Sequence, residues 1–454
     1  MNDGGGVPQR SRRENGRPVG RKRLMENRNR TENPRRLALD VLGRVERGQY
    51  ANLALDAALE RAALSAEDRA LATTLVYGVL EKQGRLDFAL AGLSSRPVEE
   101  LSPDVRALLR LGLYQLCFLD RVPDHAAVNE TVALASRKTA GYVNAVLREE
   151  IRRGKTRPLP GEDDRAAWLA VRYSVSQGLA ERLLADLGNE KATAFLNALE
   201  TPPPLTLRVN TLRTEREKLL DALQKAGFDA HPTARSRTGI LLPRGAAVRE
   251  LPGFDEGLFF VQDEASQLAV EALDARPGMR AADVCACPGS KSFGIAMEME
   301  NRGEVLACDL HASKLSLVSG GAERLGIGIL SVLARDARKP MAGAEGSFDR
   351  VLCDVPCSGF GVIGKKPELR RKDPRESAGL PAIQAAILVR SAELLRVGGR
   401  LVYSTCTVLP AENGENVAHF LADNGNFRLL SERTFYPDTD GTDGFFIAAM
   451  EKIR

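Results

Sequence analysis

Long hydrophobic runs are missing from this chain of 454 residues, since no stretch approaches about 18 uncharged apolar residues. The amino terminus is polar and rich in arginine, and it lacks the apolar core of a secretory signal. We therefore expect a cytoplasmic protein without a membrane span. Apolar residues nevertheless make up 43% of the chain, which is enough for buried cores in roughly two to four domains.

Cysteine and histidine are too few and too scattered for a disulfide framework or a metal centre. The seven cysteines are an odd number in a chain without a secretory signal, so reduced thiols are expected. The spacings Cys285-x-Cys287 and Cys353-x3-Cys357 lack a second paired half, and the four histidines lie far apart. We predict no metal site.

An excess of basic residues is confined to the amino terminus. Residues 1–36 hold eleven Lys/Arg and four Asp/Glu, out of 64 and 60 in the chain, which leaves 53 against 56 for the rest. With few large apolar side chains, residues 1–33 are predicted to be a disordered basic tail. The tail is either an arm that contacts nucleic acid or a solubilising segment.

Residues 34–155 show a helical pattern throughout. Ser102-Pro103 marks a helix start, with Ser at the cap and Pro in the first turn. The residues from Val105 to Leu116 are apolar on more than one side, which predicts a helix at the centre of a small bundle. His125 follows Val122-Pro123-Asp124 and is predicted to lie in a loop, as a structural residue or an RNA contact.

The rest of the chain divides near residue 250. Residues 156–250 predict a linker and a small α+β domain, with strands at 205–209 and 239–242 and a helix at 219–226. From residue 251 to 454 strands and helices alternate, which is typical of a doubly wound α/β sheet. The predicted strands are 281–286, 304–308, 329–334, 349–353, 400–404 and 445–449, with a helix that Gly398-Gly399 terminates.

The first two strands of this sheet are followed by residues suited to a nucleoside. The turn Cys285-Ala286-Cys287-Pro288-Gly289-Ser290-Lys291-Ser292 opens a helix but matches neither G-x-G-x-x-G nor a Walker P-loop. Asp309 ends the second strand, where a carboxylate can accept hydrogen bonds from two ribose hydroxyls. Asp336 follows the third strand and can bind an adenine amino group. The alternatives are a helix cap for Asp309 and a surface turn for Asp336.

Two cysteines each follow an apolar, strand-like run and suggest chemistry at cytosine C5. Cys357 lies in Asp354-Val355-Pro356-Cys357, and Cys406 lies in Ser404-Thr405-Cys406-Thr407. The C5 atom accepts a methyl group only after a thiolate adds to C6, and a second group must help the adduct to break down. Asp354 can bind the N3/N4 edge of the cytosine. A lone Cys357 would be interpreted as a small buried hydrophobe.

Together these motifs resemble the Nol1/Nop2/Sun family of RNA cytosine-5 methyltransferases. The resemblance rests on Asp354-Val355-Pro356-Cys357-Ser358-Gly359, on Ser404-Thr405-Cys406-Thr407, on Asp263 in Val261-Gln262-Asp263-Glu264-Ala265-Ser266 and on Arg208-Val209-Asn210-Thr211. Residues 34–155 are similar to the NusB-like domain of the bacterial Sun/RsmB-type branch, through Leu111-Gly112-Leu113-Tyr114-Gln115-Leu116 and Gly141-Tyr142-Val143-Asn144-Ala145-Val146-Leu147-Arg148.

The resemblance implies a Rossmann-like methyltransferase sheet, preceded by an all-α NusB-like bundle and a small α+β RNA-binding insert. It implies S-adenosyl-L-methionine as the methyl donor and small-subunit ribosomal RNA as the substrate, at the cytosine numbered 967 in the archetype of the branch. Cys406 is then the nucleophile and Cys357 the residue needed for product release. The implied cofactor-binding residues are Cys287, Pro288, Gly289, Ser290, Lys291, Asp309, Lys314, Asp336 and Asp354.

Ser290 departs from the family pattern, which has glycine there. We expect its side chain either to crowd the cofactor or to strain a turn of positive φ. Two alternatives to the implied function stay open: a different ribosomal or transfer RNA cytosine, and a non-catalytic RNA-binding assembly factor on the same scaffold. We expect the protein to be a monomer, and the residues do not indicate what activates Cys406.

Overall fold

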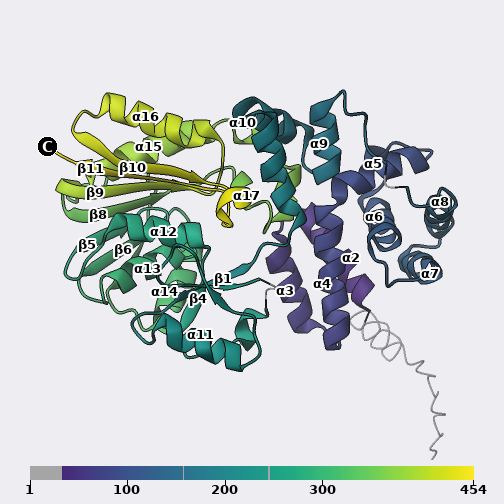
Figure 1. Cartoon of the computed structure of the whole chain (residues 1–454), viewed down its shortest axis with the longest axis horizontal. Helices are drawn as coiled ribbons and strands as arrows, with labels where there is room; N and C mark the ends of the chain where they lie inside the picture. Colours follow the sequence, from purple (N-terminus) through teal and green to yellow (C-terminus); the bar gives the residue numbers. More distant parts are fainter. Residues whose placement is uncertain (1–32, 157, 244–245) are drawn as a thin grey trace, which may run out of the picture. The chain divides into compact units, whose positions relative to one another are not determined.

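The computed structural model describes residues 33–156, 158–243 and 246–454, so the predicted basic tail lies outside the described residues (Figure 1). The described chain forms two compact units. One is helical and comprises residues 33–80 and 90–156, and the other comprises residues 81–89 and 157–454. Each unit is described separately below.

The helical part of the chain is built around one buried helix, α6. Its helices are α2 (Pro34–Glu46), α3 (Ala51–Arg61), α4 (Ala66–Glu81), α5 (Gln83–Leu93), α6 (Pro103–Phe118), α7 (Asp124–Leu134) and α8 (Ala140–Arg152). Helix α6 packs against α2, α7 and α8, which confirms its predicted central position. Gly112 allows close packing there, because a Cβ atom at this position would lie 2.7 Å from Leu147.

Two details of this unit differ from the sequence-based expectations. Ser102 occupies the N-cap of α6 and Pro103 its first turn, but the Ser102 side chain makes no capping hydrogen bond. His125 lies in the first turn of α7 and not in a loop, because Pro123 caps this helix and Asp124 begins it. The acidic residue and the preceding proline are both suited to a helix start.

The second unit contains a mixed seven-stranded sheet. Its strands are β5 (Arg280–Asp283), β6 (Glu304–Asp309), β7 (Leu330–Ala334), β8 (Phe348–Asp354), β9 (Leu395–Thr405), β10 (Phe427–Phe435) and β11 (Phe445–Lys452). They are arranged in the order β10-β11-β9-β8-β5-β6-β7. Strands β5 to β9 pair in parallel, whereas β11 is antiparallel to both β9 and β10. This is the predicted Rossmann-like arrangement with an antiparallel edge.

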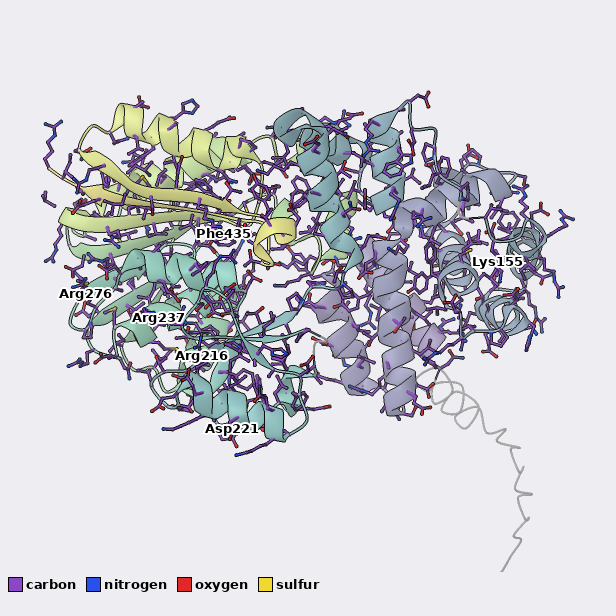
Figure 2. All side chains as sticks on the ribbon, viewed as in Figure 1. Lys155, Arg216, Asp221, Arg237, Arg276 and Phe435 are labelled. Atoms are coloured by element: carbon purple, nitrogen blue, oxygen red, sulfur yellow. The ribbon has the colours of Figure 1, made fainter. Side chains whose placement is uncertain are left out.

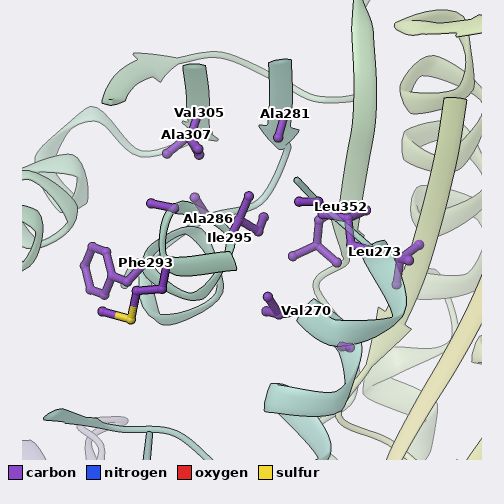
Figure 3. Packing of buried hydrophobic residues seen from close by; sticks show 14 of the residues in the cluster. Val270, Leu273, Ala281, Ala286, Phe293, Ile295, Val305, Ala307 and Leu352 are labelled. Atoms are coloured by element: carbon purple, nitrogen blue, oxygen red, sulfur yellow. The ribbon is translucent and has the colours of Figure 1, made fainter. Parts of the chain in front are cut away.

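Helices cover both faces of this sheet. They are α12 (Glu264–Leu273), α13 (Ser290–Glu298) and α14 (Leu315–Leu325) on one face, and α15 (Leu380–Glu393) and α16 (Gly414–Asp423) on the other (Figure 1). Alternate residues of each strand enter different cores: Leu352 joins Val270 and Ile295, while Val351 joins Ile387 (Figure 3). The central strand β8 is buried on both faces, which explains its apolar run Val351-Leu352-Cys353, whereas the parallel edge strand β7 is mostly exposed.

Two parts of the sheet were not predicted correctly. Strand β10 was missed because it is an edge strand whose residues between Phe427 and Phe435 are mostly exposed, so it has no apolar run. Gly398 and Gly399 do not terminate a helix. Helix α15 ends at Glu393, and both glycines lie within β9, where the pairing with β8 shifts register. Gly398 adopts φ 79°, which suits such an irregularity.

A small antiparallel sheet precedes the large one in the chain. Its order is β2-β3-β1-β4, from β1 (Leu205–Val209), β2 (His231–Pro232), β3 (Gly239–Leu242) and β4 (Phe259–Val261), and α11 (Arg216–Lys225) packs on it. The strand β4 lies beyond residue 250. Arg208 is fully buried and pairs with Glu298 of α13 at 2.8 Å, which joins the small sheet to the larger one. The remaining helices are α9 (Arg165–Tyr173), α10 (Gln177–Asn197) and α17 (Pro437–Asp440).

Candidate active site

Cys357 and Cys406 come together where two neighbouring parallel strands end. Cys406 directly follows β9 and Cys357 lies three residues after β8. Asp354 and Ser404 are register partners at the ends of these strands. The two Sγ atoms lie 3.2 Å apart, and either thiol can donate a hydrogen bond to the other. Both cysteines are half-buried, so the pair is shielded but still accessible.

The surroundings of the two sulfurs favour negative charge on Cys406. The hydrogen bond from the Cys357 thiol lowers the pKa of Cys406, with support from the cations Lys291 and Lys366 against the opposing effects of burial and of the nearby Asp354. The same hydrogen bond, together with burial and the nearby Glu412, raises the pKa of Cys357. Of the two thiols, Cys406 is therefore the one that loses its proton more readily. This arrangement identifies the activating groups that the sequence did not indicate.

Asp354 is held firmly beside the sulfurs. Lys291 Nζ lies 2.8 Å from Asp354 Oδ2, and the Ser404 hydroxyl donates to Asp354 Oδ1 at 2.7 Å. Burial lowers the pKa of Lys291, but the pairing with Asp354 outweighs it and the pKa is raised overall. Lys291 thus remains a cation between the carboxylate and the cysteine pair. Each carboxylate oxygen has a further lone pair for a substrate N–H group.

The two cysteine loops are joined by the residues that follow each cysteine. The buried Ser358 hydroxyl donates to Thr407 Oγ1 at 2.8 Å, and the Ser358 backbone N–H donates to Glu412 Oε2 at 2.9 Å. Gly361 N donates to Cys406 O at 3.0 Å, so a third bond crosses between the loops. We name the hydrogen bond between Ser358 and Thr407 the loop brace. It was not predicted, because these hydroxyls are 49 residues apart in the sequence.

The turn after β5 has the shape of a nucleotide-binding turn. Gly289 adopts φ 113° at the N-cap of α13, and the peptide bond between Cys287 and Pro288 is cis. The expectation that Ser290 strains a turn of positive φ is wrong, because the positive φ falls on Gly289 and Ser290 is the first helical residue. Burial and the nearby Asp309 raise the pKa of Cys287 to about 12, so this cysteine stays a neutral thiol.

The two carboxylates expected to contact the nucleoside lie at neighbouring strand ends. Asp309 is the last residue of β6 and accepts from His311 N at 2.9 Å and from Cys287 N at 3.3 Å. Asp336 lies two residues after β7 and forms a forked pair with Arg338, which lowers its pKa to about 2. Lys314 is exposed at the start of α14.

Sequence reasoning missed a buried carboxyl group below this turn. Asp283, the last residue of β5, is 1% exposed and accepts from the Ser292 hydroxyl at 2.7 Å. Its other oxygen, Oδ1, has no hydrogen-bond partner among the described residues. Burial raises the pKa of Asp283 to about 7. The available signal was an acidic residue inside an otherwise buried strand, which is rare without a partner.

These residues fit an S-adenosyl-L-methionine site. The donor set at the ends of β5, β6 and β7 offers backbone N–H groups, two carboxylates and the unpaired buried oxygen of Asp283, which suit hydroxyl and amino groups. Within the described residues, no group of three or more His, Cys, Asp or Glu could hold a metal ion. No helix in the described part of the chain is long and apolar enough to cross a membrane.

Comparisons with known proteins match most of the chain. Family models match at residues 32–152 (NusB family), 176–249 (Methyltr_RsmF/B-like, ferredoxin-like domain) and 270–451 (16S rRNA methyltransferase RsmB/F). The chain is 36% identical over 442 residues to the "Probable ribosomal RNA small subunit methyltransferase B" of Bacillus subtilis (strain 168), which covers 92% of this chain and 98% of the relative.

Two further similarities agree with this one. The ribosomal RNA small subunit methyltransferase B of Pseudomonas syringae pv. tomato is 36% identical over 444 residues, which is 93% of this chain and 97% of the relative. The crystal structure of PH0851 matches with a TM-score of 0.80 and 27% sequence identity, over 92% of this chain and 98% of that one.

Proposed function

Because the chain belongs to the 16S rRNA methyltransferase RsmB/F family, we propose that it transfers a methyl group from S-adenosyl-L-methionine to C5 of a cytosine in 16S ribosomal RNA. The target we propose is the cytosine of the 967 type. The observation that carries this proposal is the pair of sulfurs 3.2 Å apart, with the pKa of one lowered and that of the other raised.

The first chemical role falls to Cys406. Its thiolate adds to C6 of the cytosine, a bond forms between Sγ and C6, and the electrons of the C5–C6 double bond make C5 nucleophilic. Lys291 and Lys366 favour the thiolate before the attack. Asp354, fixed by Lys291 and Ser404, binds the N3/N4 edge of the ring. When bound, S-adenosyl-L-methionine supplies an electrophilic methyl group, which C5 takes.

Release of the product requires the second sulfur. The C5 proton leaves to a base, the double bond forms again, and the bond between Sγ of Cys406 and C6 breaks. The Cys357 thiol donates a hydrogen bond to the departing sulfur and so lowers the pKa of the leaving group. A thiolate of lower pKa leaves faster. Cys406 therefore acts in the addition step that starts the reaction, and Cys357 acts in the elimination step that releases the product.

The residues proposed to hold the donor are those at the ends of β5, β6 and β7. Cys287 to Lys291 and Asp354 would hold the donor, Asp309 would bind its ribose and Asp336 its adenine, with Lys314 near the nucleoside. The NusB-like residues 34–155 and the small α+β domain predicted within residues 156–250 position the RNA. The target cytosine must swing out of any stem, at a cost of a few kcal/mol.

The experiment is a methyl-transfer assay on unmethylated 16S ribosomal RNA with labelled S-adenosyl-L-methionine, followed by mapping of 5-methylcytosine. We expect one labelled cytosine, of the 967 type. Label at another ribosomal or transfer RNA cytosine would mean that the substrate differs from the one proposed, while the proposed reaction would stand. RNA binding without any transfer, and without heat on titration with the donor, would instead identify a non-catalytic assembly factor.

A further inference from the structure

A second cavity lies next to the cysteine loops and takes no part in the chemistry above. Its volume is about 360 Å³, within the range of small-molecule sites of roughly 300–1,000 Å³. Four parts of the chain line it: residues within 198–204, Asp263, the turn from Gly361 to Lys365, and residues within 437–443. We name it the proline-walled cavity, after Pro202, Pro203 and Pro204.

The polar groups on its wall form one cluster. Lys365 Nζ lies 2.6 Å from Asp263 Oδ1 and 2.9 Å from Asp443 Oδ2, and Asp443 N donates to Asp263 Oδ2 at 3.3 Å. Asp263 also caps α12 through Ala265 N, so both of its oxygens are occupied. Among the described residues no N–H group donates to Asp443 Oδ1, and the Asp443 carboxyl otherwise interacts with the carboxyl of Asp263. Asp443 Oδ1 is the acceptor that the cluster leaves available.

The charges of this wall determine which ligand it can accept. Asp263, Asp438 and Asp443 face only one cation, Lys365, among the residues that line the cavity. A phosphate group would be repelled by this excess of carboxylates. Burial and the neighbouring Asp263 raise the pKa of Asp443 to about 7. A neutral ligand with N–H donors, such as the edge of a nucleobase, suits the cavity better than an anion.

The cavity is also next to the nucleophile. Gly361 lines the cavity, and its N–H donates to the carbonyl oxygen of Cys406 at 3.0 Å. Lys365 faces the cavity, whereas the next residue, Lys366, is one of the cations that lower the pKa of Cys406. The short turn from Gly361 to Lys366 therefore contributes both to the cavity wall and to the surroundings of Cys406. A base in the cavity would belong to a nucleotide close to the target cytosine.

We propose that the proline-walled cavity binds a nucleotide directly flanking the target cytosine, with the exocyclic amino group of its base donating to Asp443 Oδ1. The inference rests on the proposed function and adds a determinant of sequence context. Contacts to flanking nucleotides are a general means by which enzymes acting on extruded bases select their sequence. Single-stranded RNA is read through such base edges.

The test measures KM for every combination of a set of RNA substrates with a set of enzyme variants. In the RNA, the nucleotide on each side of the mapped cytosine is replaced in turn by its counterpart without the amino group: inosine for guanosine, purine riboside for adenosine, pyrimidin-2-one riboside for cytidine. In the enzyme, Asp443→Asn keeps the size of the side chain. Lys365 should hold the amide oxygen and turn the NH2 group, a donor, towards the base.

With the wild-type enzyme, we expect KM to rise roughly tenfold when the amino group is removed from the nucleotide on one side of the target cytosine. Removal on the other side should leave KM unchanged. Asp443→Asn should raise KM for the natural RNA by a similar factor and abolish the difference between natural and modified RNA. The control Asp423→Asn changes an exposed carboxylate at the end of α16, outside the cavity and outside the insert that carries Asp221 (Figure 2), and should leave both values unchanged.

A second pair of variants tests the cavity without changing charge. A Cβ atom at Gly364 would lie 3.7 Å from Leu199 and 4.0 Å from Pro203, so alanine fits and a larger side chain enters the cavity. Gly364→Leu should therefore raise KM well above that of Gly364→Ala. Circular dichroism and the alkylation rate of Cys406 show whether each variant is folded with an intact cysteine pair.

Two outcomes would overturn the inference while the proposed function stands: KM insensitive to the amino group on both flanks, or Asp443→Asn and Gly364→Leu raising KM equally for natural and modified RNA. Failure of the wild-type enzyme to methylate any RNA would instead overturn the proposed function, and the inference with it. The inference is supported only if the effect of Asp443→Asn on KM depends on the amino group of the base on one flank of the target cytosine.

Discussion

The two halves of the site are built differently. On the sulfur side, at the ends of β8 and β9, the functional groups are held by partners distant in the sequence: Lys291 and Ser404 hold Asp354, and Ser358 holds Thr407. On the nucleoside side, Asp336 pairs with Arg338 only two residues away, and Asp309 accepts one of its two bonds from His311. The groups around the two cysteines are positioned by contacts between segments far apart in the sequence, whereas much of the donor site is positioned by local turns.

This difference predicts two kinds of failure. Changes on the sulfur side should alter the rate of the reaction and the ionisation of Cys406, because the contacts there set charge and distance around the reacting atoms. Changes on the nucleoside side should alter the affinity for the donor and leave the RNA bound.

Asp354→Asn should reduce kcat by roughly a hundredfold or more, because the charged partner of Lys291 and the group that binds the cytosine edge are lost together. Single-turnover methyl transfer to 16S ribosomal RNA measures this effect. Asp349→Asn is the matched control, since Asp349 lies on the same strand but near its other end. Similar losses in both variants would mean that β8 tolerates no change, and Asp354 would lose its assigned role.

Asp309→Ala should weaken the binding of S-adenosyl-L-methionine roughly tenfold, as expected for the loss of hydrogen bonds to a charged group. The affinity for RNA should stay within about twofold, because the carboxylate acts on the donor alone. Calorimetry gives the first value and fluorescence anisotropy the second. Equal losses, or a changed circular dichroism spectrum, would show that Asp309 only caps the turn through Cys287 and His311.

Ser358→Ala should have the smallest effect. Without the loop brace the two sulfurs separate, the hydrogen bond that lowers the pKa of Cys406 weakens, and that pKa rises towards the usual value for a thiol. The pH profile of Cys406 alkylation should then move to higher pH, with a roughly threefold lower rate at neutral pH. Ser391→Ala, which removes an equally buried hydroxyl on α15, should leave the profile in place.

The contrast between the two halves also explains what the sequence could predict. The parallel strands, the turn before α13 and the positions of Asp309, Cys357 and Cys406 follow from apolar runs and turn residues, which are local signals. The activation of Cys406 by Cys357, Lys291 and Lys366 could not be predicted, because it depends on distances between segments far apart in the sequence, 49 residues in the case of the two cysteines.

Other features could not be predicted either, because they also lack a local signal in the sequence. The cluster of Lys365, Asp263 and Asp443 joins three segments, and each residue alone is indistinguishable from a surface charge. Strand β10 is exposed along most of its length, so its sequence carries no apolar pattern. The strain expected at Ser290 does not arise, because the positive φ falls on Gly289, which tolerates it, and Ser290 is the first residue of α13.

The central claim is that Cys406 attacks and Cys357 assists release, and a matched pair of alanine variants tests it most directly. Each variant is incubated with end-labelled 16S ribosomal RNA and S-adenosyl-L-methionine and then run on a denaturing gel. Cys357→Ala should give a shifted, protease-sensitive band, because Cys406 still adds to C6 but leaves unassisted. Cys406→Ala should give no band. A band from Cys406→Ala alone would make Cys357 the nucleophile, and no band from either variant would contradict the covalent mechanism.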